Sequence, residues 1–477
     1  MKKFFKTALY LLCFLFILSC DTDFSSDYSY TKAVSELETS ASEEQEEGEA
    51  ETIETCDEEV EEEEEINRDW TILVYMAADN NLESDAITDF NELEQVDFDE
   101  SVTVLVLFDR SENYDSTNGD WSDTRLYKIC KDEQKNKTLI ASEQIDCDEL
   151  GLKVGESCEL DMSNPSTLEG FLEFSRRCYA AEQYALIIWG HGTGWRNSES
   201  LAVCETENAR AFAIDDTSSS YMTISALRSA ISSGMGTEKL AVIGFDTCFG
   251  MCVETAYELK DCAAFMLGTP ALVPESGWNY AAFLSDFMKS EKSIDSFIES
   301  AASQYAESYQ NYSYGYFSCV DLSKISDAVG KFSEFSQSLA DSIDTNTVSA
   351  EISAIITEKS LSYCASSYPT DFYVDISDML SNFAALGIDE AENVKNYFDD
   401  SIVCDWSASG ARVSLGVFFC VYISSAVMSA SHPSMYVNGS RNTGISLFVT
   451  DCTGYVPSYQ QKNGSLLDKL FYTNGNL

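Results

Sequence analysis

Histidine is scarce in this chain, with only two in 477 residues. Because histidine is the side chain that titrates nearest neutrality, such a chain has few groups for acid and base catalysis at neutral pH. His432 lies in a polar loop with no strand before it, so we interpret it as a surface residue. His191 follows an apolar run and is therefore the first candidate for chemistry.

Basic residues are also few, since 29 Lys and Arg stand against 81 Asp and Glu, for a formal net charge of -52. Such a negative field repels nucleic acid and anionic lipid headgroups and attracts cationic peptides. The composition therefore excludes nucleic acid as an expected partner and favours basic peptides or proteins.

Cysteine is not scarce, but its spacing lacks metal-binding patterns. No Cys-x-x-Cys and no Cys/His cluster with zinc spacing occurs among the 16 cysteines, so we predict no metal site from them. An export signal would permit disulfides. Cys147 and Cys158 are the most local candidate pair.

The one notable long apolar segment lies at the N-terminus. Three early lysines followed by the apolar run 7–18 are typical of a secretion signal, and the run is too short to span a membrane comfortably. Residues 1–20 end in Ile-Leu-Ser-Cys20, which resembles the lipobox of bacterial lipoproteins and predicts lipidation at Cys20. The alternative is signal-peptide cleavage near this position without lipidation. Residues 21–69 are acidic and polar and are expected to form a disordered tether. We therefore expect an exported protein that is lipid-anchored to the bacterial cell envelope.

From residue 70 onward, apolar strands alternate with helical patterns. The predicted strands are 70–78, 102–108, 121–130 (an outer strand), 185–189, 239–245 and 264–268, and the predicted helices are 83–93, 167–180, one opening at 222–228, and 254–260. This alternation is typical of an α/β fold with a mostly parallel sheet flanked by helices. In such folds the ligand site lies at the carboxyl ends of the strands.

His191 and Cys248 each follow the end of a predicted strand. If the two strands are neighbours, the imidazole and the thiol meet at one edge of the sheet. A nearby histidine or a helix N-terminus lowers a thiol pKa, and a helix running on from Phe249 is expected to place Cys248 near its first turn. The backbone N–H groups of Gly192 and Cys248 are the natural donors to an oxyanion.

Three segments of the chain form a recognisable set. They are Trp70-Thr-Ile-Leu-Val-Tyr-Met-Ala-Ala-Asp-Asn-Asn-Leu-Glu83, Ile188-Trp-Gly-His-Gly-Thr-Gly-Trp195 and Gly244-Phe-Asp-Thr-Cys-Phe-Gly-Met-Cys-Val-Glu-Thr-Ala-Tyr-Glu-Leu259. In this order they resemble the clostripain family of cysteine peptidases, which belongs to the caspase-like clan. The segments 317–323, 372–379 and 444–448 are similar to weaker family segments. The resemblance implies a caspase-like catalytic core over 70–285. Residues 286–477 are then the C-terminal part of the peptidase domain, as an α/β extension of the core.

The same resemblance implies a cysteine endopeptidase that cleaves after Arg or Lys, with His191 and Cys248 as the catalytic dyad. It assigns Asp246 to the floor of the substrate pocket, where a buried carboxylate prefers a basic partner. The alternative is that Asp246 caps the helix that follows. Gly277 and Trp278 also match the family, and Trp278 is expected to contact substrate.

The sequence is compatible with more than one specificity and activity. The 268–276 loop departs from the family pattern, so a non-basic specificity is one alternative, and a non-catalytic surface lipoprotein that binds peptides is another. Arg196 and Arg210 are candidate self-cleavage sites in the loop between histidine and cysteine. No cofactor is required by this sequence, but the resemblance makes calcium a possible one, because some relatives require it. Asp79, Asp215 and Asp216 near strand ends are the candidate ligands, and the preferred interpretation is that they are surface turn residues, since two adjacent acids are weak evidence for a calcium site.

Overall fold

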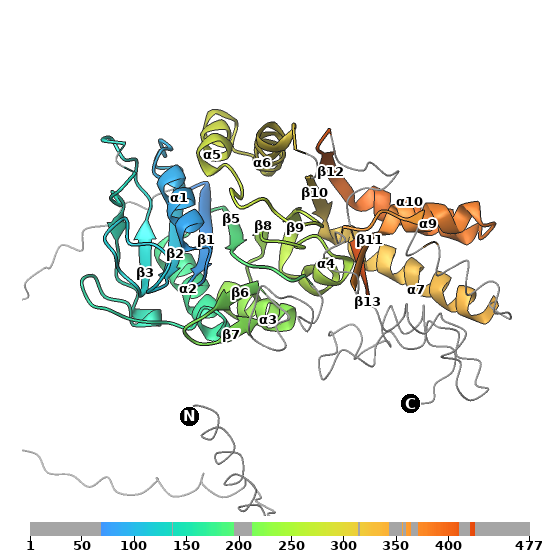
Figure 1. Cartoon of the computed structure of the whole chain (residues 1–477), viewed down its shortest axis with the longest axis horizontal. Coiled ribbons are helices and arrows are strands. Elements are labelled where there is room, and N and C mark those ends of the chain that lie inside the picture. Colours follow the sequence, from blue (N-terminus) through green and yellow to red (C-terminus); the bar gives the residue numbers. More distant parts are fainter. Residues whose placement is uncertain are drawn as a thin grey trace, which may run out of the picture. The chain divides into compact units, whose positions relative to one another are not determined.

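The computed structural model describes residues 68–135, 137–194, 212–312, 315–342, 355, 359–363, 371–409 and 420–424. Its centre is a nine-stranded sheet with the strand order β12-β10-β9-β8-β5-β1-β2-β3-β4 (Figure 1). The strands of this sheet are β1 (Trp70–Ala78), β2 (Val102–Arg110), β3 (Thr124–Lys128), β4 (Glu143–Gln144), β5 (Gln183–Trp189), β8 (Leu240–Asp246), β9 (Ala263–Gly268), β10 (Tyr316–Asp321) and β12 (Ile402–Ser407). Two small antiparallel pairs accompany it, β6 (Phe212–Asp215) with β7 (Ser220–Met222) and β11 (Asp371–Asp375) with β13 (Cys420–Ser424).

The middle of the sheet is parallel. Strands β2, β1, β5, β8 and β9 pair with one another in parallel, whereas β3, β4, β10 and β12 pair antiparallel toward the two edges. Every residue of β1 and β2 is buried, as expected for parallel strands covered on both faces. The predicted α/β fold with a mostly parallel sheet is confirmed.

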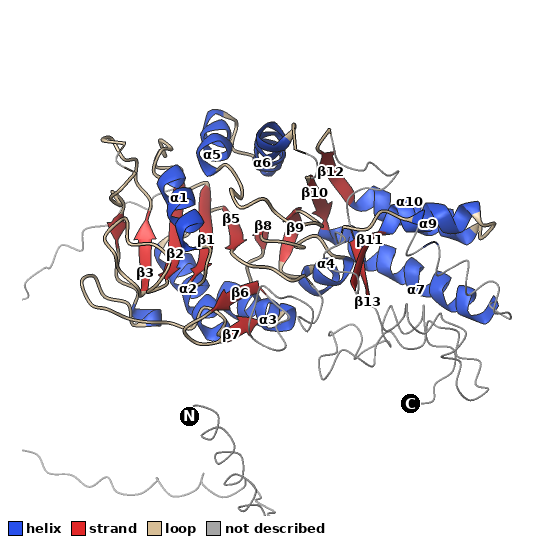
Figure 2. Ribbon diagram, viewed as in Figure 1, coloured by secondary structure: helices blue, strands red, loops and turns tan. Residues whose placement is uncertain are grey.

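Helices cover both faces of the sheet (Figure 2). They are α1 (Glu83–Leu93), α2 (Pro165–Cys178), α3 (Ile224–Met235), α4 (Val253–Leu259), α5 (Tyr280–Lys289), α6 (Ile294–Tyr309), α7 (Ile325–Ser342), α9 (Ile376–Ala385) and α10 (Glu390–Ser401), with short 3-10 turns η1 (Asp148–Leu150) and η3 (Leu322–Lys324). Side chains of β1 alternate between two cores: Ile72 and Val74 pack with α1, α5 and α6, and Leu73 and Tyr75 pack with α2, α3 and α4. In the described part of the chain, no helix is both long and apolar enough to cross a membrane.

Three local expectations are corrected by the structure. The outer strand predicted over 121–130 is confined to β3, because Trp121 lies in the preceding loop and its ring packs edge-on against Phe108. Met222 ends β7, and the helix starts at Ile224, because the side chain of Thr223 accepts a hydrogen bond from the Ala226 N–H and caps α3. The helix expected from Phe249 begins only at Val253.

The candidate disulfide between Cys147 and Cys158 is not formed, since both cysteines are free thiols. Cys147 is fully buried and exchanges backbone hydrogen bonds with Leu152. Cys158 lies on another segment, where its carbonyl accepts a hydrogen bond from the Thr124 N–H. Each cysteine is therefore fixed by a different backbone partner.

Candidate active site

His191 and Cys248 lie at the same edge of the sheet. Strands β5 and β8 are parallel neighbours, with Trp189 opposite Asp246 in their register. His191 lies two residues after Trp189, and Cys248 lies two residues after Asp246. Both side chains line one pocket of about 250 Å³. The remaining lining residues are Asn81, Leu82, Asp85, Trp189, Gly190, Asp246, Thr247, Val273, Pro274, Glu275 and Gly277.

Two glycines shape the turn that carries His191. Gly190 has a φ of 130°, and a Cβ there would lie 2.8 Å from the Ala77 carbonyl oxygen. A Cβ at Gly192 would lie 2.4 Å from the Cys248 carbonyl oxygen, so the histidine and cysteine loops touch through their main chains. Glycine is therefore required at 192 by this contact, independently of any substrate. Its role as an oxyanion donor remains a prediction.

The ring of His191 is held by Asn81. His191 Nε2 lies 2.8 Å from Asn81 Oδ1, and because a carbonyl oxygen only accepts, the ring donates its Nε2–H and keeps Nδ1 as the basic nitrogen. Burial lowers the pKa of His191 to about 4, which keeps the imidazole neutral at neutral pH. Sequence reasoning missed Asn81. The sequence feature that could have identified Asn81 is its position just after β1, the strand that pairs with β5.

The thiol of Cys248 accepts a hydrogen bond from the Val273 N–H, with an N to Sγ distance of 3.4 Å. Such a donor favours the thiolate. The expected help from a helix N-terminus is wrong, because α4 begins at Val253 with Cys252 as its N-cap residue. The intervening loop is instead held by backbone hydrogen bonds to 269–271 and passes through Phe249 at a φ of 57°.

Asp246 lines the pocket and is 5% exposed. Its Oδ2 accepts hydrogen bonds from the Trp278 N–H and the Tyr280 hydroxyl, both at 3.0 Å. Its Oδ1 is buried and has no hydrogen-bond partner among the described residues. Burial raises the pKa of Asp246 to about 7. The helix-cap alternative is wrong, because the donors to this carboxylate come from Trp278 and Tyr280 and not from the start of α4.

Trp278 reaches this site only through its backbone N–H. Its indole is 3% exposed and packs edge-on against Phe283 and Phe317 in the core. A Cβ at Gly244 would lie 2.8 Å from the indole, so the ring fills the space against β8. The indole therefore packs in the core against β8, and the Trp278 backbone N–H supports Asp246, while a contact of Trp278 with substrate stays a prediction.

Further carboxylates surround the pocket, and sequence reasoning missed them. Asp85 and Glu275 line it, and burial and the charge of Glu275 raise the pKa of Asp85. Behind them, Asp89 Oδ2 accepts a 2.7 Å hydrogen bond from Trp189 Nε1. Burial and then the charge of Asp246 hold the pKa of Asp89 well above its usual range. Glu275 belongs to the 268–276 loop, so the segment that departs from the family pattern lies at the pocket.

Tyr373 of β11 contacts both the loop after His191 and the loop after Cys248. Its hydroxyl donates a 2.5 Å hydrogen bond to the Thr193 carbonyl oxygen, two residues after His191. Its ring stacks on Phe249, one residue after Cys248, with centroids 4.7 Å apart. The C-terminal part of the chain therefore helps to fix the relative position of the two loops.

Two of the acids near strand ends are buried. Asp79 and Asp215 are each 1% exposed, so the interpretation of these two acids as surface turn residues is wrong, whereas Asp216 is exposed. Asp79 Oδ2 and Asp215 Oδ1 accept 2.7 Å hydrogen bonds from the backbone N–H groups of Thr217 and Ser218 in the β6–β7 turn.

Several predictions fall on residues outside the described ones. These are the signal segment, residues 21–67 of the tether, Cys20, Arg196, Arg210, His432 and the similarity at 444–448. The tether was expected to run to residue 69, and this end is wrong, because Arg68 is 9% exposed and donates a 2.9 Å hydrogen bond to the Ala180 carbonyl oxygen.

Comparison with solved structures defines the class of fold. The chain is similar to a secreted C11 cysteine protease from Bacteroides thetaiotaomicron, solved with an irreversible peptide inhibitor, at a TM-score of 0.54 and 16% identity over 84% of this chain and 99% of that one. An inactive zymogen C11 protease from Parabacteroides distasonis gives a TM-score of 0.54 and 18% identity over 75% of this chain and 92% of that one. The fold is therefore the caspase-like α/β fold of these proteins.

The sequence places the chain within that class. The model of the clostripain family, peptidase family C11, matches residues 74–474, and the chain belongs to this family. It is 30% identical to clostripain from Hathewaya histolytica over 202 residues, which are 41% of this chain and 36% of that protein. The match thus spans about a third of the curated relative's length.

Proposed function

We propose that this protein is a cysteine endopeptidase that hydrolyses peptide bonds after Arg or Lys. The observation that carries the proposal is the pocket itself, where His191 and Cys248 stand beside three carboxylates, those of Asp85, Asp246 and Glu275. Membership of the clostripain family and the likeness to C11 cysteine proteases support the peptidase activity.

The proposed chemistry uses both side chains. Cys248 Sγ attacks the substrate carbonyl carbon, and its proton passes to His191 Nδ1. The backbone N–H groups of Gly192 and Cys248 stabilise the oxyanion. His191 then protonates the leaving amine, which leaves a thioester on Cys248. A water molecule deprotonated by His191 hydrolyses the thioester, while Asn81 keeps the ring oriented throughout.

The substrate preference rests on Asp246. Its buried Oδ1 lacks a hydrogen-bond partner among the described residues, so a guanidinium or ammonium group entering the pocket finds an acceptor there. A cation at this position also favours the ionised form of a carboxyl group whose pKa burial has raised to about 7. Asp85 and Glu275 add negative charge at the same pocket.

The test is hydrolysis of fluorogenic peptides that present Arg, Lys, Asn or Asp before the reporter group, under reducing conditions. We expect the Arg and Lys substrates to be cleaved and Cys248→Ala to be inactive. Cleavage after Asn or Asp alone would contradict the basic preference, and activity in Cys248→Ala would contradict the mechanism. An intact wild type that neither cleaves nor reacts with thiol-directed probes would favour the peptide-binding lipoprotein.

We further propose export and lipid anchoring to the cell envelope through Cys20, on the basis of the lipobox-like segment. Metabolic labelling with an alkyne fatty acid tests this, with label expected on wild type and absent from Cys20→Ser. For the proposed cuts after Arg196 or Arg210, wild type and Cys248→Ala should give different fragment patterns. Identical patterns would exclude self-cleavage.

A further inference from the structure

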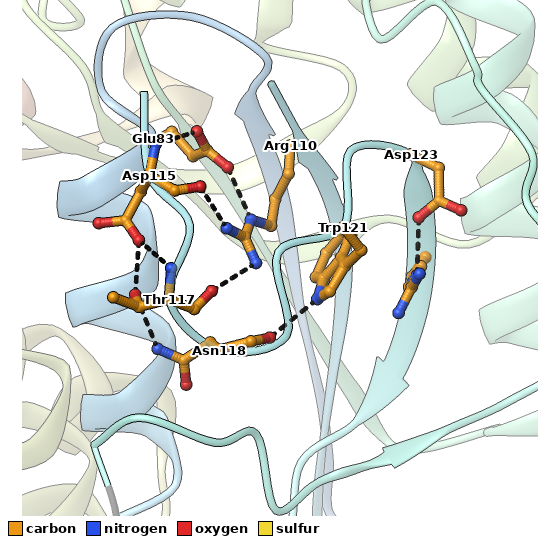
Figure 3. Close-up of polar contacts among 8 residues, drawn as sticks. Glu83, Arg110, Asp115, Thr117, Asn118, Trp121 and Asp123 are labelled. Atoms are coloured by element: carbon orange, nitrogen blue, oxygen red, sulfur yellow. Dashed lines mark hydrogen bonds and ion pairs between the residues drawn. The ribbon is translucent and has the colours of Figure 1, made fainter. Parts of the chain in front are cut away.

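Two groups of buried side chains outside the pocket have no part in the proposed mechanism. The first surrounds Arg110, the last residue of β2, and Figure 3 shows its guanidinium enclosed by Glu83, Asp115 and Thr117. Its Nε lies 2.7 Å from Glu83 Oε1, and it donates to the carbonyl oxygens of Asp115 and Thr117 at 3.0 and 3.1 Å. These contacts join the end of β2 to the start of α1 and to the loop after β2, so we interpret this group as structural.

The second group is a pair of free thiols, Cys319 of β10 and Cys404 of β12. β12 is the edge strand of the sheet and runs antiparallel to β10, with Cys404 directly opposite Cys319 (Figure 1). The register shifts only beyond this pair, between Cys319 and Val320. Opposed residues of antiparallel strands have Cα atoms about 4.5 or 5.5 Å apart, and a disulfide joins Cα atoms about 4.4–6.8 Å apart. The strand pairing therefore holds the two cysteines at a separation that a disulfide can span.

Both thiols lie on the face of the sheet that α6 covers. Cys319 belongs to the core on that face, and Cys404 packs against it. The next opposed pair on this face, Phe317 and Trp406, contacts the ring of Tyr305 from α6. The Cys319 thiol donates a hydrogen bond to Cys404 Sγ, so the two sulfur atoms already face each other.

The two thiols differ in accessibility and acidity. Cys319 is fully buried, and burial followed by the hydrogen bond to Cys404 holds the pKa of Cys319 well above its usual range. Cys404 is partly exposed, and the hydrogen bond from Cys319 lowers the pKa of Cys404. A thiolate is the attacking species in thiol–disulfide exchange, which makes Cys404 the attacking thiol and Cys319 the one that resolves the mixed disulfide.

We propose that Cys319 and Cys404 form a disulfide bond by exchange with a disulfide-containing oxidant. The Cys404 thiolate attacks one sulfur of the oxidant, breaks its S–S bond and releases the other sulfur as a thiolate. Cys319 then loses its proton to solvent and attacks Cys404 Sγ, which releases the remaining half of the oxidant. The cysteine pair loses two electrons and two protons, and the oxidant takes them up as two thiols. The proposed export brings the chain to a compartment where such oxidants act.

The bond would secure the edge of the sheet to the rest of the fold. Among the described strands, β12 pairs with β10 alone. A bond between the two cysteines closes a loop of about 85 residues, which restricts the unfolded chain. That loop contains α7, α9, α10 and β11. Because β11 carries Tyr373, the bond would also fix the ends of the segment that contacts the loops after His191 and Cys248.

Disulfide formation is measured on the full chain carrying Cys248→Ala, so that the proposed nucleophile takes no part. The reduced protein is incubated with oxidised glutathione, alkylated, digested without reductant and analysed by mass spectrometry. We expect a pair of peptides joined through Cys319 and Cys404 that separates on reduction. Glutathione retained on Cys404 without this cross-link, or both cysteines recovered only as alkylated thiols, would overturn the proposal. The readout needs no turnover, so it is independent of the proposed peptidase activity.

Thermal unfolding of two matched variants tests what the bond does. Oxidation should raise the Tm of the Cys248→Ala protein by roughly 3–7 °C. Adding Cys404→Ser should abolish this rise, whereas adding Cys130→Ser, at an exposed cysteine beyond β3, should preserve it. An unchanged Tm on oxidation, or the same rise with Cys404→Ser, would contradict a stabilising bond between β10 and β12.

Discussion

The proposed preference for arginine should depend on the charge of Asp246. Asp246→Asn keeps the size of the side chain, and its amide oxygen can still accept from the Trp278 N–H and the Tyr280 hydroxyl. The partnerless Oδ1, however, becomes an amide NH₂ that repels a guanidinium. The substitution therefore removes the acceptor and the charge while leaving the surrounding hydrogen bonds in place.

The expected loss follows from the type of interaction. A hydrogen bond to a charged group contributes about 1.5–3 kcal/mol, which corresponds to roughly a 10- to 150-fold fall in kcat/KM for an arginine substrate. A matched substrate with citrulline, which has the shape of arginine but no charge, should change only a few-fold. The ratio of arginine to citrulline cleavage should therefore fall by at least tenfold.

The assay measures kcat/KM for the two substrates at pH 8 in wild type and Asp246→Asn. The rate at which iodoacetamide alkylates Cys248 serves as the control and should be the same in both proteins. If the arginine to citrulline ratio survives the substitution while alkylation is unchanged, the role of Asp246 in selectivity is refuted.

Three more results are expected. Since the folded-state pKa of Asp246 is about 7, above an unfolded value of about 3.9, the folded state binds more protons between these values. The free energy of unfolding, measured by urea denaturation, should therefore fall as pH rises from about 4 to 7. It should fall less steeply in Asp246→Asn, and equal slopes in the two proteins would contradict this prediction. Asn81→Ala removes the acceptor for His191 Nε2–H and should lower kcat about 2- to 10-fold with little change in KM. Asn81→Asp places a negative charge beside the ring and should raise the pKa of His191 in the pH–rate profile. Tyr373→Phe keeps the stacked ring but loses the hydrogen bond to the Thr193 carbonyl, so unfolding free energy should drop by about 1 kcal/mol; no drop would mean that the bond is not stabilising.

The sequence by itself determined the strands and their chemistry. Continuous apolar runs predicted β1, β2, β5 and β8 because a strand buried on both faces has no polar side to alternate with. The positions of His191 and Cys248 after such runs then indicated one edge of the sheet, because parallel strands end together. These inferences use only neighbouring residues and the direction of the chain.

Only the tertiary structure decided which distant groups meet at that edge. Whether Asp246 capped a helix or formed a pocket depended on donors 32 and 34 residues away, and Asn81 reaches His191 across 110 residues. Cys319 and Cys404 looked like unrelated cysteines until the strand order placed them opposite each other on β10 and β12. Local propensity and periodicity describe residues a few positions apart, whereas these contacts depend on the order of strands in the sheet and on the paths of the loops between them.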